Sequence, residues 1–134
     1  MPSGRRVSYL DSSAIVKLAV REPQSAALRR YLVRRRAWVS SALARTEVGR
    51  ALLPFGATAT RRGGDVLARI DLVRINDRVL ADAATLLPAE LRSVDAIHLA
   101  TARLLGDALA RVITYDDRMA DAARGLGLSV VAPQ

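Results

Sequence analysis

The sequence has 134 residues and contains no cysteine, one histidine and one lysine. Without cysteine, disulfides and cysteine metal sites are excluded, which fits a cytoplasmic protein. A single histidine cannot form a histidine-rich zinc site, so a metal would need mostly oxygen ligands, as magnesium and manganese do. No apolar stretch is long enough for a transmembrane helix, so no membrane association is predicted. The N-terminus also lacks the long apolar segment of a signal peptide.

The sequence carries an excess of positive charge. Lysine and arginine number 21 against 13 acidic residues, for a formal net charge of +8, and only Lys17 among the basic residues is not an arginine. The planar guanidinium group suits phosphate, so the balance indicates a polyanionic partner, namely nucleic acid. The alternative is an arginine-rich genome whose surface charges serve only solubility.

Strand and helix patterns alternate along the chain. Strands are predicted over 7–11, 37–40, 72–75, 110–115 and 128–133, and helices over 12–20, 23–35, 42–54, 65–70, 78–87, 94–105 and 117–125. Ser40 or Ser41 is expected to cap the third helix, and residues 56–64, with three glycines, are expected to be the least regular segment. The alternation predicts a single α/β domain over 1–134, with a parallel sheet of about four to five strands between helices.

Three carboxylates stand at strand ends or in first helical turns. Asp11 and Asp116 each follow a predicted strand, and ligands of parallel sheets bind beyond the carboxyl ends of the strands. Asp95 is the sole charged residue between Ser93 and Arg103 in a helix that is otherwise almost entirely apolar. The alternative for all three is structural, because aspartate also caps helices and favours their first turn.

Glu47 is the fourth candidate. At about 100° per residue from Leu43, Glu47 lies at about 40° and Ala51 at about 80°, so the glutamate falls inside the apolar arc of its helix. A carboxylate that faces a core is costly unless it is paired or binds a metal. The alternative is a glutamate at the edge of the apolar face that pairs with a nearby arginine.

Taken together, the four carboxylates favour a metal site. Two unit charges 4 Å apart repel by roughly 4 kcal/mol at an effective dielectric of about 20, so a cluster of four needs a cation. A divalent ion would remove that cost and could activate water against a phosphodiester. Arginines that hold a backbone around an acidic pocket are what cleavage of nucleic acid requires.

The motifs YLDSSAIVKL, SALARTEV, SVDAIHLATA and VITYDDRMADAA span residues 9–123. In this order and spacing they resemble PIN-domain ribonucleases, specifically the VapC-type toxins of toxin–antitoxin pairs. The resemblance implies a three-layer α/β/α PIN-like fold and an endoribonuclease dependent on Mg²⁺ or Mn²⁺. It further implies cleavage of structured RNA such as tRNA or rRNA loops, neutralisation by a cognate VapB-type antitoxin, and a homodimer.

Residue by residue, the resemblance maps the family's catalytic and metal-binding acidic quartet onto Asp11, Glu47, Asp95 and Asp116. Thr114 matches a supporting hydroxyl position and Ser12 a small polar one, while His98 matches a histidine that is common there without being catalytic. Asp117 is an extra carboxylate, either an outer ligand or a helix cap, and the cap is favoured. A group of arginines could bind RNA, form a solvated face, or belong to a dimer or antitoxin surface, and the sequence does not separate these roles. The group consists of Arg29, Arg30, Arg34, Arg35 and Arg36.

Two other functions are compatible with the sequence. One is a non-catalytic basic α/β module that binds nucleic acid, in which the aspartates only cap helices. The other is a PIN nuclease of RNA processing that has no antitoxin.

Overall fold

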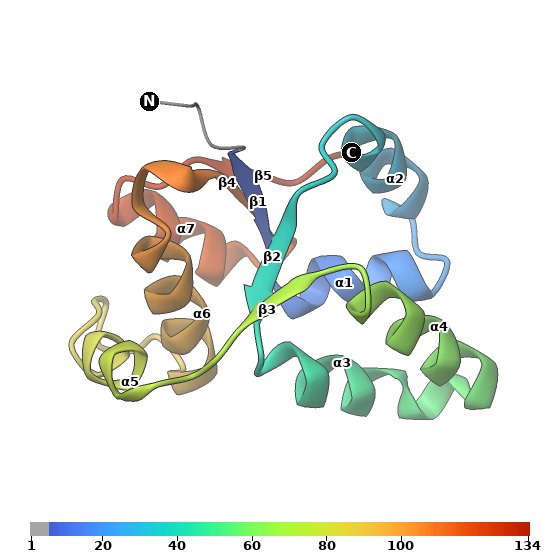
Figure 1. Cartoon of the computed structure of the whole chain (residues 1–134), viewed down its shortest axis with the longest axis horizontal. Coiled ribbons are helices and arrows are strands. Elements are labelled where there is room, and N and C mark those ends of the chain that lie inside the picture. Colours follow the sequence, from blue (N-terminus) through green and yellow to red (C-terminus); the bar gives the residue numbers. More distant parts are fainter. Residues whose placement is uncertain (1–5) are drawn as a thin grey trace.

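A single parallel sheet forms the centre of the molecule in the computed structural model, which describes residues 6–134 (Figure 1). Its strands lie in the order β3-β2-β1-β4-β5, and every neighbouring pair is parallel. The predicted parallel sheet of four to five strands is therefore confirmed. The strand bounds are β1 (Val7–Leu10), β2 (Trp38–Ser41), β3 (Asp71–Val73), β4 (Leu109–Ile113) and β5 (Val130–Val131).

Helices cover both faces of this sheet. Figure 1 shows one layer formed by α1 (Ser12–Ala19), α2 (Ser25–Val33), α3 (Ala44–Leu52) and α4 (Ala57–Leu67). The opposite layer contains α5 (Asp77–Ala84), α6 (Ser93–Leu104) and α7 (Asp117–Gly125). Short 3-10 turns, η1 (Leu53–Phe55) and η2 (Gly106–Ala108), follow α3 and α6. Among residues 6–134, no helix combines the length and the apolar character that crossing a bilayer requires.

The central strands are buried on both sides. Successive strand residues point to opposite faces, so Leu10 and Ile113 pack into the core under α1, α3 and α4. Tyr9 and Val112 point the other way, into a cluster that includes Ala102 of α6. Because β1 and β4 are central and parallel, with Leu10 paired to Ile113, the residues that follow them emerge side by side.

The prediction of an irregular segment at 56–64 is wrong. Within this segment, only Gly56 has a positive φ, of +91°, a backbone conformation that favours glycine, and it stands just before α4. Gly63 lies inside the helix, where the absence of a side chain lets α4 approach Leu52 of α3. The predicted helix at 65–70 is correspondingly wrong in its bounds, because α4 already begins at Ala57 and ends at Leu67.

The start of α3 also differs from the prediction. Ser40 and Ser41 both belong to β2, and neither is the N-cap of α3, so the predicted serine cap is wrong. Leu43 precedes α3, and its backbone N–H donates to Ser41 Oγ at 3.1 Å in the connecting turn. Strong strand pairing with β3, which extends to Ser41, overrides the capping preference of serine.

Candidate active site at the carboxyl ends of the central strands

Asp11 follows β1 at the carboxyl end of the sheet. It is 3% exposed and its Oδ1 accepts hydrogen bonds from Ser13 Oγ at 2.6 Å and the Ala14 backbone N–H at 3.1 Å. The second of these bonds makes Asp11 the N-cap of α1. Burial nevertheless raises the pKa of Asp11, because these donors offset only part of the lost hydration. A cap alone would not need such deep burial, so this carboxylate is held at an energetic cost.

Thr114 connects the two strand ends. Its hydroxyl donates to Asp11 Oδ2 at 2.5 Å, and its oxygen accepts the Asp116 backbone N–H at 3.1 Å. Asp116 is in turn the N-cap of α7, with Oδ1 accepting from the backbone N–H groups of Arg118 and Met119. The expectation that Asp11 and Asp116 share one edge of the sheet thus holds, and Thr114 joins them.

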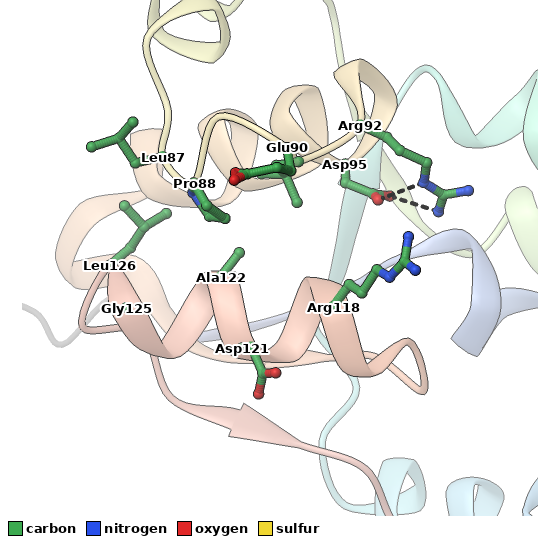
Figure 2. A pocket seen from close by; sticks show the side chains of 11 residues that line it. Leu87, Pro88, Glu90, Arg92, Asp95, Arg118, Asp121, Ala122, Gly125 and Leu126 are labelled. Atoms are coloured by element: carbon green, nitrogen blue, oxygen red, sulfur yellow. Dashed lines mark hydrogen bonds and ion pairs between the residues drawn. The ribbon is translucent and has the colours of Figure 1, made fainter.

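Asp95 enters the same area from the first turn of α6. Its side chain is only 6% exposed, and it receives two hydrogen bonds from Arg92, from Nε at 3.0 Å and Nη2 at 3.4 Å. The same Nη2 lies 3.3 Å from Asp116 Oδ2, so one guanidinium group bridges the two aspartates. The hydrogen bond to Asp95 raises the pKa of Arg92, so the bridge stays cationic. Figure 2 shows the contact between Arg92 and Asp95.

Glu47 is held by side chains from α1 and α6. Its Oε1 accepts from Ser12 Oγ at 2.6 Å and lies 2.6 Å from His98 Nε2. The other nitrogen of His98, Nδ1, lies 2.7 Å from the hydroxyl of Tyr9, which is fully buried on β1. The tautomer with the proton on Nε2 satisfies both contacts, with Tyr9 donating to His98 and His98 donating to Glu47.

The pKa of Glu47 follows from these contacts. Burial would raise it, but the hydrogen bonds from His98 and Ser12 outweigh burial, and the pKa lies below its ordinary value. Glu47 is therefore kept ionised. In agreement with its predicted place on the apolar face, the Glu47 side chain is only 25% exposed and is hydrogen-bonded to the buried His98. His98 is buried and hydrogen-bonded.

The donor set fits a hard dication by its chemistry. All four carboxylates offer oxygen, and Asp95 and Asp116 already share one cation, Arg92, between them. Within residues 6–134, however, no three acidic or histidine side chains stand together as a ready-made metal-binding group. The pairs Asp11–Asp116 and Asp95–Asp116 are linked through Thr114 and Arg92. Glu47 is held by Ser12 and His98. Because no three of these side chains stand together, closing all four carboxylates on one ion requires side-chain movement.

Comparisons with known proteins identify the family of this chain. The sequence matches the PIN domain family over residues 8–125. It is 64% identical over 125 residues to Ribonuclease VapC46 of Mycobacterium tuberculosis, an alignment that covers 93% of this chain and 96% of that protein. The chain belongs to the PIN-domain family, among the VapC ribonucleases.

Solved structures of low sequence identity share the PIN fold. The crystal structure of Mycobacterium tuberculosis VapC20, a toxin that cleaves the sarcin–ricin loop, superposes with a TM-score of 0.75 at 16% identity, over 94% of this chain and 99% of that one. A toxin–antitoxin complex from Klebsiella pneumoniae gives a TM-score of 0.68 at 20% identity, over 95% of this chain and 98% of the matched one. The three-layer architecture expected from the motifs is therefore confirmed.

Not every predicted residue lies at the acidic end of the PIN domain. Asp117 is exposed and is the first residue of α7, while Asp116 is the cap, so the favoured role of Asp117 as a cap is wrong. The proposed RNA-binding arginines lie on α2 and in the turn before β2, away from the carboxyl ends of the strands: Arg29, Arg30, Arg34, Arg35 and Arg36.

Sequence reasoning missed three residues of this PIN-domain site. Arg92 was detectable, because it precedes Asp95 by three residues at a helix start, a spacing at which opposite charges meet. Ser13 donates to Asp11, but a serine at a helix start is ordinary and gives no separate signal. Tyr9 gave no signal, since a buried strand tyrosine is ordinary and its contact with His98 spans 89 positions.

A groove of about 880 Å³ adjoins the acidic residues between the loop that precedes α6 and helix α7. Figure 2 shows Arg92, Asp95 and Arg118 at one end, and Leu87, Pro88 and Leu126 at the other. Of the four candidate carboxylates, Asp95 lines this partly apolar groove of the PIN domain.

Proposed function

We propose that this PIN domain, treated as a single domain over 1–134, is a metal-dependent endoribonuclease toxin. Asp11, Glu47, Asp95 and Asp116 would hold Mg²⁺ or Mn²⁺. The observation that carries the proposal is that Asp95 and Asp116 share one cation beside the buried pair of Asp11 and Thr114. A dication bound there would polarise the phosphodiester and favour the deprotonated form of an attacking water.

The chain's own residues prepare the site for that role. Thr114 and Ser13 fix both oxygens of Asp11, so its orientation does not depend on solvent. His98 and Ser12 keep Glu47 ionised and aimed at the site. Arg92 offsets one of the two negative charges of Asp95 and Asp116, and its side chain is 61% exposed, so it would be accessible to a phosphate.

The biological setting is also part of the proposal. The relatives are named ribonucleases, and a structural neighbour is a toxin–antitoxin complex, which supports a cognate antitoxin as the partner. We propose a cytoplasmic homodimer that cleaves structured RNA, such as tRNA or rRNA loops, and leaves 5′-phosphate ends. An antitoxin would act by covering the carboxylates.

Cleavage of labelled hairpin RNA tests this function. The wild-type protein is expected to cut in Mg²⁺ or Mn²⁺ and to stop on addition of chelator, and Asp95→Asn is expected to lose at least about 100-fold in rate, the upper range for loss of a metal-supporting group. Asp65→Asn is the matched control, because Asp65 is an exposed carboxylate on α4. RNA binding that persists without any cleavage, in all proteins and metals, would instead favour a non-catalytic module.

A further inference from the structure

A cluster of arginines lies at the opposite end of the sheet from the carboxylates. Five of them line a depression of about 270 Å³, and among residues 6–134 its other lining residues are alanines, with no acidic side chain. We name it the arginine cluster: Arg6, Arg34, Arg35, Arg36 and Arg111.

The parallel topology of the sheet assembles this cluster. Arg6 directly precedes β1, residues 34–36 lie just before β2, and Arg111 is in β4. Since β1 lies between β2 and β4, the amino ends of the three strands are adjacent, and Ser8 of β1 pairs with both Trp38 and Arg111. The residues meet in space although more than 100 positions separate Arg6 from Arg111.

Several of the guanidinium groups are held in place by the fold. Arg111 Nη1 donates to Ser8 Oγ at 2.6 Å, and Arg6 Nη2 donates to the Leu109 carbonyl at 2.8 Å. Arg35 Nη1 donates to the Tyr31 carbonyl at 2.8 Å and lies over the Tyr31 ring. Each guanidinium has five N–H donors, so one such bond leaves four for a ligand. The cluster is therefore pre-oriented but far from saturated.

The charge of the cluster is not balanced locally. Within residues 6–134, none of the five arginines takes part in an ion pair. Like charges that are held close together repel, and a bound polyanion would relieve that cost. Arginine forks also match the two oxygens of a phosphate.

We propose that the arginine cluster is a second RNA site, which binds the phosphate backbone of the substrate away from the cut. This inference rests on the proposed function, since it assigns the contact to the same RNA. A lining of arginine and alanine offers no apolar floor for a protein helix. Phosphate is therefore a better occupant than a protein partner.

The spacing of the two ends sets a minimum length for the RNA. The four residues of β1 separate the cluster from Asp11, and at about 3.3 Å per residue they span roughly 13 Å before side chains are added. A stacked strand advances about 3.4 Å per nucleotide, so a dinucleotide at the carboxylates does not reach the arginines. A longer or a folded RNA does, so the cluster favours substrates longer than a dinucleotide.

Salt-dependent binding tests the proposal. Arg34, Arg35 and Arg36 are exposed, so the triple change to glutamine is compared with a control triple, R61Q/R62Q/R103Q, which removes the same charge from exposed positions on α4 and α6. Both triples are made in an Asp95→Asn background, so that the RNA is not cut. Affinity for a labelled RNA hairpin is measured by fluorescence anisotropy at salt concentrations from about 50 to about 300 mM, where phosphate contacts dominate the salt dependence.

The cluster triple is expected to bind at least about tenfold more weakly and to lower the slope of log K against log[salt] by about two to three, one unit or slightly less for each lost phosphate contact. The control triple should change the slope by less than about one. In the active background, the cluster triple should raise KM for the hairpin and leave kcat unchanged.

Equal losses in both triples, or an unchanged slope in the cluster triple, would overturn the second site. Binding of an acidic peptide that is lost in the cluster triple while RNA binding is retained would assign the surface to a protein partner instead. If the wild-type protein cuts no RNA, the proposed function fails, yet the anisotropy measurement still decides whether the cluster binds RNA.

Discussion

The carboxylates of this site are tuned by burial, by hydrogen-bond donors and by the guanidinium group of Arg92. Asp11 and Glu47 are both buried to some degree, yet the pKa of Asp11 is raised and that of Glu47 is lowered. The difference arises because Asp11 is almost fully desolvated, whereas Glu47 keeps partial solvent contact and also faces His98. His98 is therefore a positioning residue that acts through Glu47.

Replacing His98 tests that role. In His98→Ala the pKa of Glu47 should rise toward its ordinary value of about 4.3, and kcat/KM should fall by about 10- to 100-fold. The acid limb of the pH–rate profile should move to higher pH. His98→Gln, which restores an N–H donor, should recover part of the shift, and a profile that stays in place in both variants would show that His98 only fills space.

The shifted pKa of Glu47 determines how its contribution to folding stability depends on pH. The folded-state pKa of Glu47 lies below its unfolded value, so its contribution to stability is present above the unfolded pKa and is lost as pH falls through the folded pKa. The part of the stability difference between wild type and His98→Ala that comes from ionisation should therefore shrink in acid. Urea denaturation of both proteins measures this difference at about pH 7 and at about pH 3.5. These values lie about three units above and about one unit below the ordinary pKa of glutamate.

Arg92 is the second residue whose replacement is informative. Arg92→Gln removes the cation shared by Asp95 and Asp116, so the metal-free protein should melt at a lower temperature because Asp95 is buried without a counterion. Mn²⁺ should bind roughly tenfold more tightly by calorimetry, about 1.4 kcal/mol, because no guanidinium competes for the oxygens. Weaker binding would mean that Arg92 supports the ion rather than replacing it.

At the scale of elements, α4 shows how a helix can form from an unpromising sequence. Its residues include Gly63, Gly64 and three residues of β-branched type, all poor helix formers. Tertiary packing compensates, because α4 contacts α1 and α3 and buries Ala59 and Gly63. A side-chain Cβ at position 63 would clash with Leu52 Cδ1, whereas position 64 faces open space.

The two glycines form a matched pair for a stability measurement. Gly63→Ala should lose about 1–2 kcal/mol in urea denaturation, since overpacking against the buried Leu52 outweighs the gain in helix propensity. Gly64→Ala should gain about 0.5–1 kcal/mol from propensity alone. Equal gains in both variants would show that α3 and α4 can separate freely at this point.

This pair also shows which elements the sequence can predict. Alternating apolar runs were enough to identify all five strands and most helices, because those patterns reflect burial within one segment. Gly63 was read as a breaker because its role depends on Leu52, a contact between two helices that no local pattern encodes. In the same way, Asp11 and Asp116 were placed correctly by strand ends, while Tyr9 and its contact with His98 required the folded sheet.

At the scale of the whole molecule, the sheet separates two charge environments. Carboxylates gather where the central strands end, and the arginine cluster lies where they begin. The net charge of +8 predicted a polyanionic partner, but only the strand order β3-β2-β1-β4-β5 decides which arginines come together. Composition therefore indicates the class of ligand, and topology indicates its location.

Metal binding should be visible in global stability. An ion that binds only the folded state at 100 times its Kd adds about 2.7 kcal/mol, so Mn²⁺ or Mg²⁺ should raise the Tm of the wild-type protein by several degrees. Chelator should reverse the rise, and Asp95→Asn should show little of it. A Tm that ignores both ions up to millimolar concentration would argue against the metal site even if RNA is cut.

The outer strands have a bearing on how this molecule meets other proteins. β3 has three residues and β5 has two, so each rim of the sheet exposes very little unpaired backbone. Such short rims give an incoming chain too few amide and carbonyl groups to extend the sheet, which also discourages fibril-like stacking. Recognition of any protein should accordingly depend on side chains of the helical layers, and substitutions there, rather than along the rims, should alter assembly.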